Sequence, residues 1–287
     1  MKKLLYQFDT DALPSVFDNV VGYDGGADHI TAFGGVTADT VGGLVEGAIF
    51  TRSPKEKKNT ALFVGGSDML KGEAMLGAIR AKFFGKFRVS VMFDCNGSNT
   101  TASAAVAWLA HGRSLHGKRA IVLAGSGPVG QRAAALLARE GARVAITGRK
   151  LIVVQAACKA IKSRFAIDVE AIEAPTGAER GAAIKDAHVV LATGAAGVSL
   201  LDAKQWQDNP SLELIADANA SPPAGIEGVG LSDRGASSHG KILFGALGFG
   251  ALKLALHRAC IARLFEQNDL VLDAEEIYGI ATTMVGT

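Results

Sequence analysis

Short apolar runs alternate with longer segments of helical periodicity in the first part of the chain. Apolar runs at residues 3–8, 60–64 and 88–93 predict buried strands, because each is short and ends at a polar residue or a glycine. This alternation is typical of a parallel sheet covered by helices. Helices are predicted at residues 15–21, 37–46 and 68–83, and from the turn at 94–101 to about residue 111.

A second alternating run begins at Lys118, after a linker at residues 112–117. Two further helices are predicted after Leu243, one ending near residue 265 and one over residues 274–284 with Asp273 as its cap. Between Lys118 and Leu243, strands are predicted at 119–124, 143–147, 168–172, 188–192 and 213–216, and helices at 128–140, 151–165 and 179–186.

The length of the chain supports two domains of the α/β class. A single core rarely grows much beyond about 250 residues, and the chain has 287. We predict a smaller α/β substrate domain at residues 1–112 and a Rossmann domain with a parallel sheet, for a nucleotide, at residues 113–247. Residues 248–287 are predicted to form helices that pack back on the substrate domain and complete it.

Composition and charge argue against several classes of protein. The formal net charge is +2, and the basic tract at residues 55–58 is interpreted as a solvated loop, so we expect no nucleic-acid partner. Three separated cysteines without CxxC and six histidines without HExxH predict neither disulfides nor a metal site. A signal-like start and a run of about 18 apolar residues are both missing, so we expect a cytoplasmic protein without a membrane partner.

The strongest motif is GxGxxG at residues 125–130, directly after an apolar run and before a helical segment. The first glycine permits a tight turn, the second lets the backbone approach a pyrophosphate, and the third allows close packing of helix on strand. The helix N-terminus then faces the phosphates. This context favours dinucleotide binding over a purely structural turn. The predicted contacts are Gly125, Ser126, Gly127, Pro128, Val129 and Gly130.

The end of the next predicted strand favours NADP over NAD. An NAD enzyme usually carries Asp or Glu there, but this chain has Thr147, Gly148, Arg149 and Lys150. The two cations are suited to a 2′-phosphate, to which Thr147 can also donate. In the alternative interpretation both charges are solvated at the start of a helix, and NAD remains open as a cofactor.

A turn of small residues follows a later Rossmann strand, from Ala192 to Gly194. In a Rossmann unit this turn would lie beside the ribose and nicotinamide of the cofactor, so both residues are predicted contacts. The alternative is an ordinary turn between a strand and the next element.

Polar residues also follow the third strand of the predicted N-terminal domain. In open α/β sheets, ligands bind outside the carboxyl ends of the strands. Asp94, Asn96, Asn99 and Thr100 offer several donors and acceptors there, which suits a flat polar heterocycle. Helix capping explains one or two of these residues but not all of them.

Lys253 stands in an otherwise apolar helix start after a run of glycines. It is either a substrate contact or a surface residue that extends its charge to water. His257 and Arg258, one turn further on, are interpreted as helix-surface residues, and His29 is a weaker candidate for a cleft. A nucleophile with a neighbouring base and a Tyr-x-x-x-Lys pair are both missing. Since a hydroxyl substrate normally needs a general base, we predict hydride loss from a carbon whose neighbouring nitrogens absorb the charge.

Together these motifs resemble the methylenetetrahydromethanopterin dehydrogenases of methylotrophic bacteria. The resemblance covers nearly the whole chain. It implies oxidation of the methylene bridge of a tetrahydropterin C1 carrier to the methenyl form with NADP or NAD(P), some members also accepting methylenetetrahydrofolate. It rests on YQFDTD at residues 6–11, GYDGGADH at 22–29, NGSNTT at 96–101, GSGPVG at 125–130, FGALG at 244–248 and Lys253.

The resemblance also implies a mechanism and a set of substrate contacts. The lone pairs of two nitrogens delocalise the charge as hydride leaves, so a metal is unnecessary and the protein mainly holds pterin and nicotinamide face to face in a cleft between two α/β units. Asp18 or Asp94 is expected to pair with the pterin amino group and ring N–H, and Lys253 to bond the pterin carbonyl or a nearby nitrogen. The implied pterin contacts are Phe17, Asp18, Asp94, Asn96, Asn99 and Thr100, with Lys253 as the catalytic candidate.

Two other functions compete with this one. A shikimate-type NADP dehydrogenase shares the domain order, but it needs a Lys–Asp pair beside a hydroxy acid, and no convincing pair is found. A non-catalytic NADP-binding sensor is a different class, and the polar turn after residue 94 argues against it. The similar folate-type bifunctional dehydrogenase/cyclohydrolases use a Tyr-x-x-x-Lys pair for hydrolysis, and this chain lacks it, so we expect no cyclohydrolase activity. Apolar surface on the C-terminal helices predicts a homo-oligomer.

Overall fold

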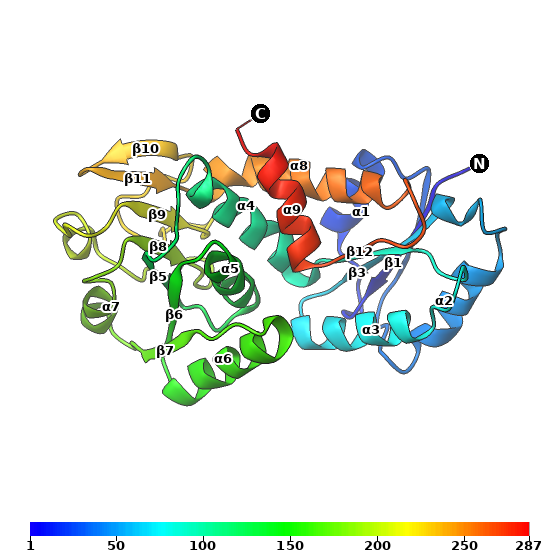
Figure 1. Cartoon of the computed structure of the whole chain (residues 1–287), viewed down its shortest axis with the longest axis horizontal. Helices are drawn as coiled ribbons and strands as arrows, with labels where there is room; N and C mark the ends of the chain where they lie inside the picture. Colours follow the sequence, from blue (N-terminus) through cyan, green and yellow to red (C-terminus); the bar gives the residue numbers. More distant parts are fainter. Residues whose placement is uncertain (287) are drawn as a thin grey trace. The chain divides into compact units, whose positions relative to one another are not determined.

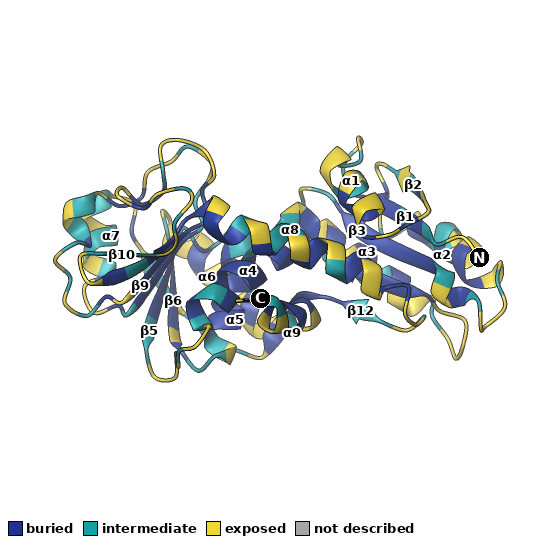
Figure 2. Ribbon diagram, turned by 90° about the horizontal axis from the view of Figure 1, so that it is seen from above, coloured by how far each residue is buried: buried dark blue, intermediate teal, exposed yellow. Residues whose placement is uncertain are grey.

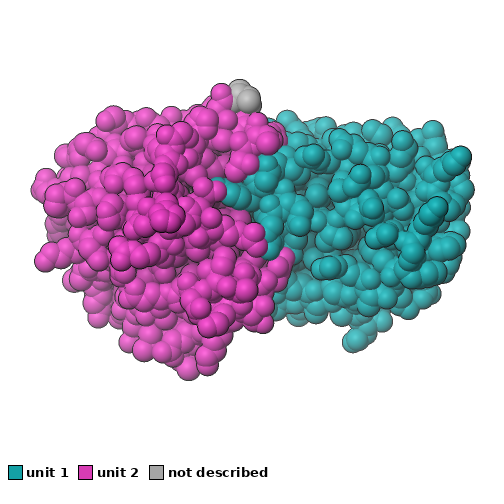
Figure 3. All heavy atoms as spheres, viewed as in Figure 1, with its two compact units in different colours: residues 1–100, 254–280 teal, residues 101–253, 281–287 magenta. Residues whose placement is uncertain are grey.

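The computed structural model describes residues 1–286, and the chain divides into two compact units (Figure 3). Unit 1 comprises residues 1–100 and 254–280, and unit 2 comprises residues 101–253 and the segment that begins at residue 281. The contacts therefore divide the chain at residues 100 and 253, whereas the sequence analysis puts the boundaries at 112 and 247. The difference arises because two long helices each contribute residues to both units.

Unit 1 is built on a five-stranded sheet in which all neighbouring strands are parallel, as the alternation of apolar runs predicts. Strands β2 and β12 were not predicted from the sequence, and His29, the weaker candidate for a cleft, begins β2. β12 has only two residues, and β2 is an edge strand with just one buried residue, so the apolar signal of each is weak. In order across the sheet, the strands are β12 (Val271–Leu272), β4 (Ser90–Phe93), β3 (Thr60–Gly65), β1 (Leu4–Asp9) and β2 (His29–Phe33).

Helices cover both faces of this sheet (Figure 1). On one face, Phe8, Leu62 and Phe93 form a buried core with α2 (Val41–Phe50) and α3 (Met69–Ala81). On the other face lie α1 (Val16–Asp24) and α8 (Ala246–Arg263), where Phe63 stacks on His257 and a Cβ added to Gly25 would meet Ile261.

In unit 1, side-chain caps fix two of the predicted helix starts, and a third helix begins later than predicted. The Ser15 hydroxyl accepts from the N–H of Asp18, and the Asp68 carboxylate accepts from two N–H groups of α3. The helix predicted from residue 37 begins only at Val41, because Thr37 instead forms a turn with Thr40. The hydroxyls of the two threonines bond each other there, which shortens the helix at its start.

Unit 2 contains a seven-stranded sheet that is parallel except for one hairpin. The sequence analysis missed this hairpin. His239 and Gly240, which join its strands, both have positive φ, as a tight hairpin turn requires. In order across the sheet, the strands are β10 (Arg234–Ser238), β11 (Lys241–Phe244), β9 (Leu214–Asp217), β8 (Val189–Ala192), β5 (Arg119–Leu123), β6 (Arg143–Gly148) and β7 (Glu170–Glu173).

The strand order reverses beside β5, because the chain passes from β5 to β6 and β7 on one side and then returns to β8 and β9 on the other. Ligands of doubly wound sheets bind at such a reversal. Figure 2 shows the strands buried and the helices exposed on one side. Within residues 1–286, α8 and the other helices are too short or too polar to cross a membrane. The remaining helices are α4 (Ser98–Ala110), α5 (Pro128–Arg139), α6 (Leu151–Phe165), α7 (Gly177–Ala183) and α9 (Ala274–Met284).

The turn between β5 and α5 generates a first prediction. A Cβ on Gly130 would lie 2.5 Å from Cα of Gly125, whereas a Cβ on Gly127 would meet no atom within 4 Å. We expect Gly130→Ala to lower the free energy of unfolding by about 1–3 kcal/mol, the usual cost of overpacking. Gly127→Ala is the matched control and should leave the free energy unchanged. Urea denaturation of both variants measures the difference, and equal stability would refute the packing argument.

Candidate active site

The turn after β5 in unit 2 has the geometry that an anionic ligand requires. The chain leaves the strand through Ala124 at a φ of 52°, and α5 begins at Pro128 without a side-chain cap. The N-cap residue Gly127 has open space where a side chain would project. No protein atom therefore requires glycine there, and its absence of a side chain keeps the helix N-terminus accessible to a ligand. A phosphate fits the exposed N–H groups and the positive end of the helix dipole.

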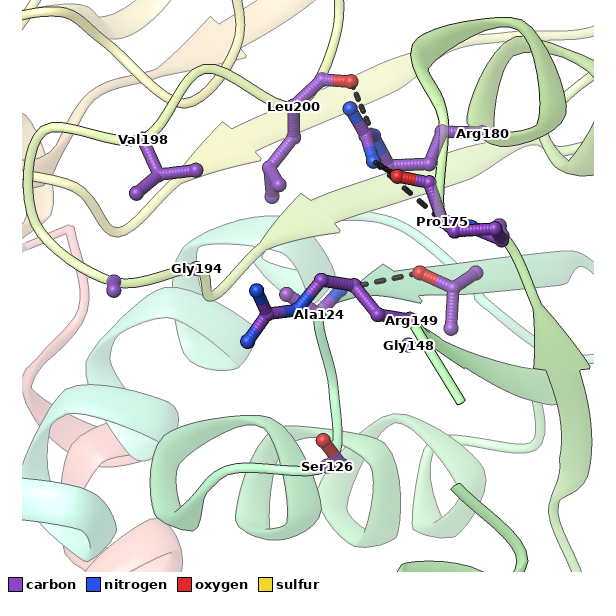
Figure 4. Close-up of a pocket in the computed structure, with 12 residues that line it drawn as sticks. Ala124, Ser126, Gly148, Arg149, Pro175, Arg180, Gly194, Val198 and Leu200 are labelled. Carbon is purple, nitrogen blue, oxygen red and sulfur yellow. Dashed lines mark hydrogen bonds between the residues drawn. The ribbon is translucent and has the colours of Figure 1, made fainter. Parts of the chain in front are cut away.

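Two cavities adjoin this turn. The first has a volume of about 370 Å³ and is lined by residues at the carboxyl ends of β5 to β8 (Figure 4). The second, of about 500 Å³, shares Ser126, Gly148 and Arg149 with the first and adds Lys150 and Val153. Carboxylate side chains are missing from both linings within the described part of the chain. The first cavity is lined by Ala124, Ser126, Thr147, Gly148, Arg149, Ala174, Pro175, Arg180, Gly194, Ala195, Val198 and Leu200.

Arg149 is the most prominent cation of this site. It is exposed, lines both cavities, and has no carboxylate partner among residues 1–286. Figure 4 shows its guanidinium extending across the first cavity. An unpaired guanidinium beside a helix N-terminus is suited to a phosphate monoester. The residues of this site therefore fit a dinucleotide that carries an additional phosphate on its ribose.

The other predicted cofactor contacts lie at different depths. The Thr147 hydroxyl is buried and accepts from the N–H of Ala124, so it fixes the corner where β5 meets the turn and retains its own hydrogen for donation. Gly194 lines the first cavity. Ala192 is buried inside β8, paired with Leu123 and Asp217 of the neighbouring strands, and lies outside the cavity lining. The cavity wall begins after Ala192, so its contact with a cofactor stays a prediction.

Sequence reasoning missed Arg180 at this cavity. Its Nε donates to Leu200 O at 2.6 Å, and its Nη1 donates to Pro175 O at 2.9 Å. Pro175 O is only five residues away, but Leu200 O is 20 residues away, and the sequence around Arg180 does not indicate that contact.

At the carboxyl edge of the sheet in unit 1, the predicted polar turn is a closed hydrogen-bond network. Asp94 Oδ1 accepts from the backbone N–H groups of Asn99 at 2.8 Å and Thr100 at 3.0 Å, and Oδ2 accepts from the Thr100 hydroxyl at 2.6 Å. Asn99 Nδ2 donates to Phe93 O at 2.6 Å and to Asp273 Oδ1 at 3.0 Å.

The side chains of Asp94, Asn99 and Thr100 are fully buried, and these bonds lie within unit 1. The helix-capping interpretation accounts for more of the turn than the sequence analysis allowed. Direct contact of these three residues with a substrate stays a prediction. Asn96 differs from them, because it is exposed and is held in the left-handed region at a φ of 56°. Its N–H donates to Gly66 O at 2.7 Å, which fixes its position at the end of β3.

Several carboxylates gather at the same edge. A Cβ added to Gly65 would lie 3.5 Å from both Asp9 Oδ2 and Asp18 Oδ2, so both groups face the end of β3. The pKa of the Cys95 thiol is raised far above its usual value, first by burial and then by Asp94, Asp9, Asp18 and Asp11. The thiol therefore stays protonated and is no nucleophile. This edge favours a ligand that presents N–H donors or positive charge.

His257 lies at this edge, and its assignment to the helix surface is wrong. Its side chain is fully buried, its ring stacks on Phe63 at 5.4 Å, and the half-exposed Phe17 lies 6.3 Å away. His257 Nδ1 is 4.0 Å from Asp94 Oδ2. The signal was the spacing of His257 with the buried Cys260 and Leu264, which places all three on one side of α8.

The remaining candidates on α8 and β2 are placed as follows. Arg258 lies on the surface, as expected, and pairs with Asp24 at 2.6 Å. Lys253 is half-buried on α8, and His29 is exposed at the start of β2. A further buried polar group, Gln7 Oε1 in the middle of β1, has no hydrogen-bond partner within residues 1–286 and was also missed. In the same residues no three or more His, Cys, Asp or Glu side chains group as metal ligands would.

The amino-acid sequence is similar to those of known dehydrogenases. A family model described as methylene-tetrahydromethanopterin dehydrogenase, N-terminal, matches residues 16–96. The bifunctional protein MdtA of Methylorubrum extorquens is 58% identical over 285 residues, which cover 99% of each chain. The NAD(P)-dependent methylenetetrahydromethanopterin dehydrogenase of the same organism is 35% identical over 222 residues, 75% of each chain.

Among solved structures, shikimate 5-dehydrogenase from Listeria monocytogenes superimposes with a TM-score of 0.53 at 12% identity. The match covers 97% of this chain and 96% of that one. At this identity the likeness concerns the fold alone. It confirms the predicted two-part α/β architecture with a Rossmann-type sheet.

The closed network around Asp94 generates a second prediction. In Asp94→Ala, two buried N–H groups and one hydroxyl lose a charged acceptor, and each such bond contributes about 1.5–3 kcal/mol. We expect the free energy of unfolding to fall by about 3 kcal/mol or more, measured by thermal and urea denaturation. Asp39→Ala, at an exposed loop position, is the control and should change stability little. A loss below about 1 kcal/mol for Asp94→Ala would mean that water replaces the carboxylate.

Proposed function

Because the chain belongs to the methylene-tetrahydromethanopterin dehydrogenase family, we propose that it transfers a hydride from the methylene carbon of a methylene-tetrahydropterin to NADP. The carrier leaves in its methenyl form. The observation that best supports this function is the uncapped helix N-terminus over the glycine turn, beside a cavity that holds the unpaired Arg149.

Unit 2 supplies the residues that would hold the cofactor. The pyrophosphate fits against Gly127 and the first N–H groups of α5. The 2′-phosphate fits beside Ser126, Arg149 and Lys150, which line the second cavity together. The lack of a carboxylate in both linings supports NADP over NAD, because a carboxylate there would repel the added phosphate. When bound, the oxidised nicotinamide supplies the acceptor for the hydride.

The reaction itself needs no general base. One C–H bond of the methylene group breaks, its electron pair and hydrogen leave together, and the two neighbouring nitrogens share the resulting positive charge. No proton is released from the carrier, which agrees with the inert Cys95 thiol and with the lack of an activated nucleophile at this edge. The protein therefore accelerates the reaction by orientation and by exclusion of water. Holding two reactants in register can lower a barrier by about 7–11 kcal/mol.

The carboxyl edge of unit 1 is our proposed site for the pterin. The carboxylates that surround Cys95 create negative potential, which suits the amino group and ring N–H of a pterin. Asp18 is our candidate for this pairing, the half-exposed Phe17 for contact with the ring, and Asn96 for a polar contact at the end of β3. Asp94, Asn99 and Thr100 would act mainly by holding Asn96 in place. Lys253 is proposed to bond the pterin carbonyl or a nearby nitrogen.

The finer points of specificity remain proposals. We propose methylenetetrahydromethanopterin as the preferred carrier, with methylenetetrahydrofolate as a second substrate, and we propose that the enzyme works as a cytoplasmic homo-oligomer. The decisive assay follows the absorbance of NADPH with each methylene carrier and with NADP or NAD. Reduction of NADP with either carrier would support the function. Tight binding of NADP without reduction by either carrier would instead favour a sensor.

The cofactor assignment makes a third prediction. Arg149→Ala removes a charged donor to the 2′-phosphate, a loss of about 1.5–3 kcal/mol or roughly 10- to 100-fold in affinity. We expect the KM for NADP to rise by this factor while the KM for NAD stays nearly constant. Steady-state kinetics with both cofactors measure the ratio. An unchanged KM for NADP would remove Arg149 from the site.

A fourth prediction concerns Lys253. Loss of the proposed bond from Lys253 would let the pterin ring move out of alignment with the nicotinamide. A misplacement of about 1 Å can lower the rate about 100-fold. We expect Lys253→Ala to lower kcat by this order while the Kd for NADP, measured by titration, remains that of the wild type. Lys159→Ala, at an exposed position on α6, serves as the control. A turnover close to that of the wild type would exclude Lys253 from the reaction.

A fifth prediction concerns hydrolysis of the product. The three tyrosines of the chain, Tyr6, Tyr23 and Tyr278, are each followed four residues later by a residue other than lysine. We therefore propose that the enzyme has no cyclohydrolase activity. The methenyl carrier, incubated with enzyme and without cofactor, should decay at the uncatalysed rate. A rate that increases in proportion to enzyme concentration would overturn this proposal.

A further inference from the structure

Arg180 connects two separate walls of the first cavity in unit 2. Its Nε bonds Leu200 O at 2.6 Å, and its Nη1 bonds Pro175 O at 2.9 Å and Ala174 O at 3.4 Å. Figure 4 shows the guanidinium between these carbonyls, which belong to different loops. Ala174 and Pro175 follow β7, whereas Leu200 ends the loop that follows β8. All four residues line the cavity.

Other contacts fix the outer ends of these two loops. Leu200 N donates to Gly225 O at 2.7 Å, and the side chain of Gln205 donates to Gly177 O at the start of α7. Arg180 is therefore the contact that ties the two loops to each other at the cavity itself. Without it, the loop over residues 193–200, which includes the exposed Val198, keeps fewer bonds beside the ligand space.

The helix that carries Arg180 is itself fixed by a capping box. Thr176 Oγ1 accepts from the N–H of Glu179, and Glu179 Oε2 accepts from the Thr176 N–H at 2.8 Å. The bonds from the Thr176 hydroxyl and N–H lower the pKa of Glu179. The capping box therefore contributes fully to stability at pH values above the ordinary pKa of a glutamate. This contribution is lost only as the pH falls through the lowered pKa of Glu179.

Arg149 and Arg180 both line this cavity, but their guanidinium groups differ in their hydrogen-bond partners. Arg149 has no carboxylate partner in residues 1–286, whereas Arg180 directs donors to three neutral carbonyls. Building on the proposed function, we propose that Arg180 is a positioning residue for the part of the nucleotide common to NADP and NAD. Recognition of the 2′-phosphate belongs instead to Arg149 and its neighbours in the second cavity. Arg180 acts by holding the two loops in the form that the nucleotide needs, so that binding does not have to order them.

Calorimetric titration of the purified full-length protein with NADP and with NAD tests this division, without any pterin present. The variants are Arg180→Met, Arg180→Lys and Arg149→Ala. Lys159→Met is the matched control, since it removes an exposed cation of the same unit outside both cavity linings. Amide hydrogen exchange over residues 193–200 reports on the loop directly.

Arg180→Met should lower the affinity for NADP and for NAD by the same factor, about three- to tenfold. It should also speed amide hydrogen exchange over residues 193–200. Arg149→Ala should lower the affinity for NADP and leave the affinity for NAD unchanged. Arg180→Lys should recover part of the affinity, because an ammonium can still donate to Leu200 O. Wild-type affinity of Arg180→Met for both nucleotides would overturn the inference, as would a loss confined to NADP, which would indicate direct contact with the phosphate. Failure of the wild-type protein to bind either nucleotide would instead refute the proposed function.

Discussion

The close approach of two backbone segments, at Gly125 and Gly130, determines the geometry of unit 2. Because no Cβ fits between them, α5 must begin directly against the end of β5. Its first N–H groups are thereby directed to the point where the strand order reverses. The two cavities, both lined by Ser126 and Arg149, adjoin the helix start that this contact fixes. A side chain at Gly130 would displace the helix start and with it the whole anion site.

The carboxyl edges of the two sheets have opposite electrostatic character. In unit 2 the cavities are lined by arginine, lysine and uncharged residues, so anionic ligands are favoured. In unit 1 the edge is crowded with aspartates, some of them bonded to backbone N–H groups. Such a division suits a reaction between an anionic nucleotide and a ring rich in N–H donors that becomes positively charged. The acidic edge of unit 1 therefore disfavours the anionic nucleotide, and the cationic lining in unit 2 disfavours a positively charged ring.

Much of this arrangement could be predicted from the sequence because its signals are local. The buried strands are unbroken apolar runs, and the motif at residues 125–130 marks the start of α5 at Pro128. The missed features depend on distant partners or weak patterns. The β10–β11 hairpin turns at His239 rather than at the usual Asn or Asp, and β12 is two residues long. The residue type of His257 is typical of a surface position, and only its spacing with buried neighbours on α8 indicates that it is buried. Arg180 bonds carbonyls up to 20 residues away, a relation that only the folded chain reveals.

The last strand of unit 1 has a consequence for synthesis on the ribosome. β12 pairs with β4, and residues 254–280 belong to unit 1 although all of residues 101–253 precede them. The first hundred residues therefore emerge with β4 as an open edge and with one face of their sheet covered by α1 but not yet by α8, while the intervening unit is translated. An open edge is prone to pair with other chains, and domains generally fold as units during translation. The N-terminal sheet thus gains its last edge strand only after the intervening unit has been made.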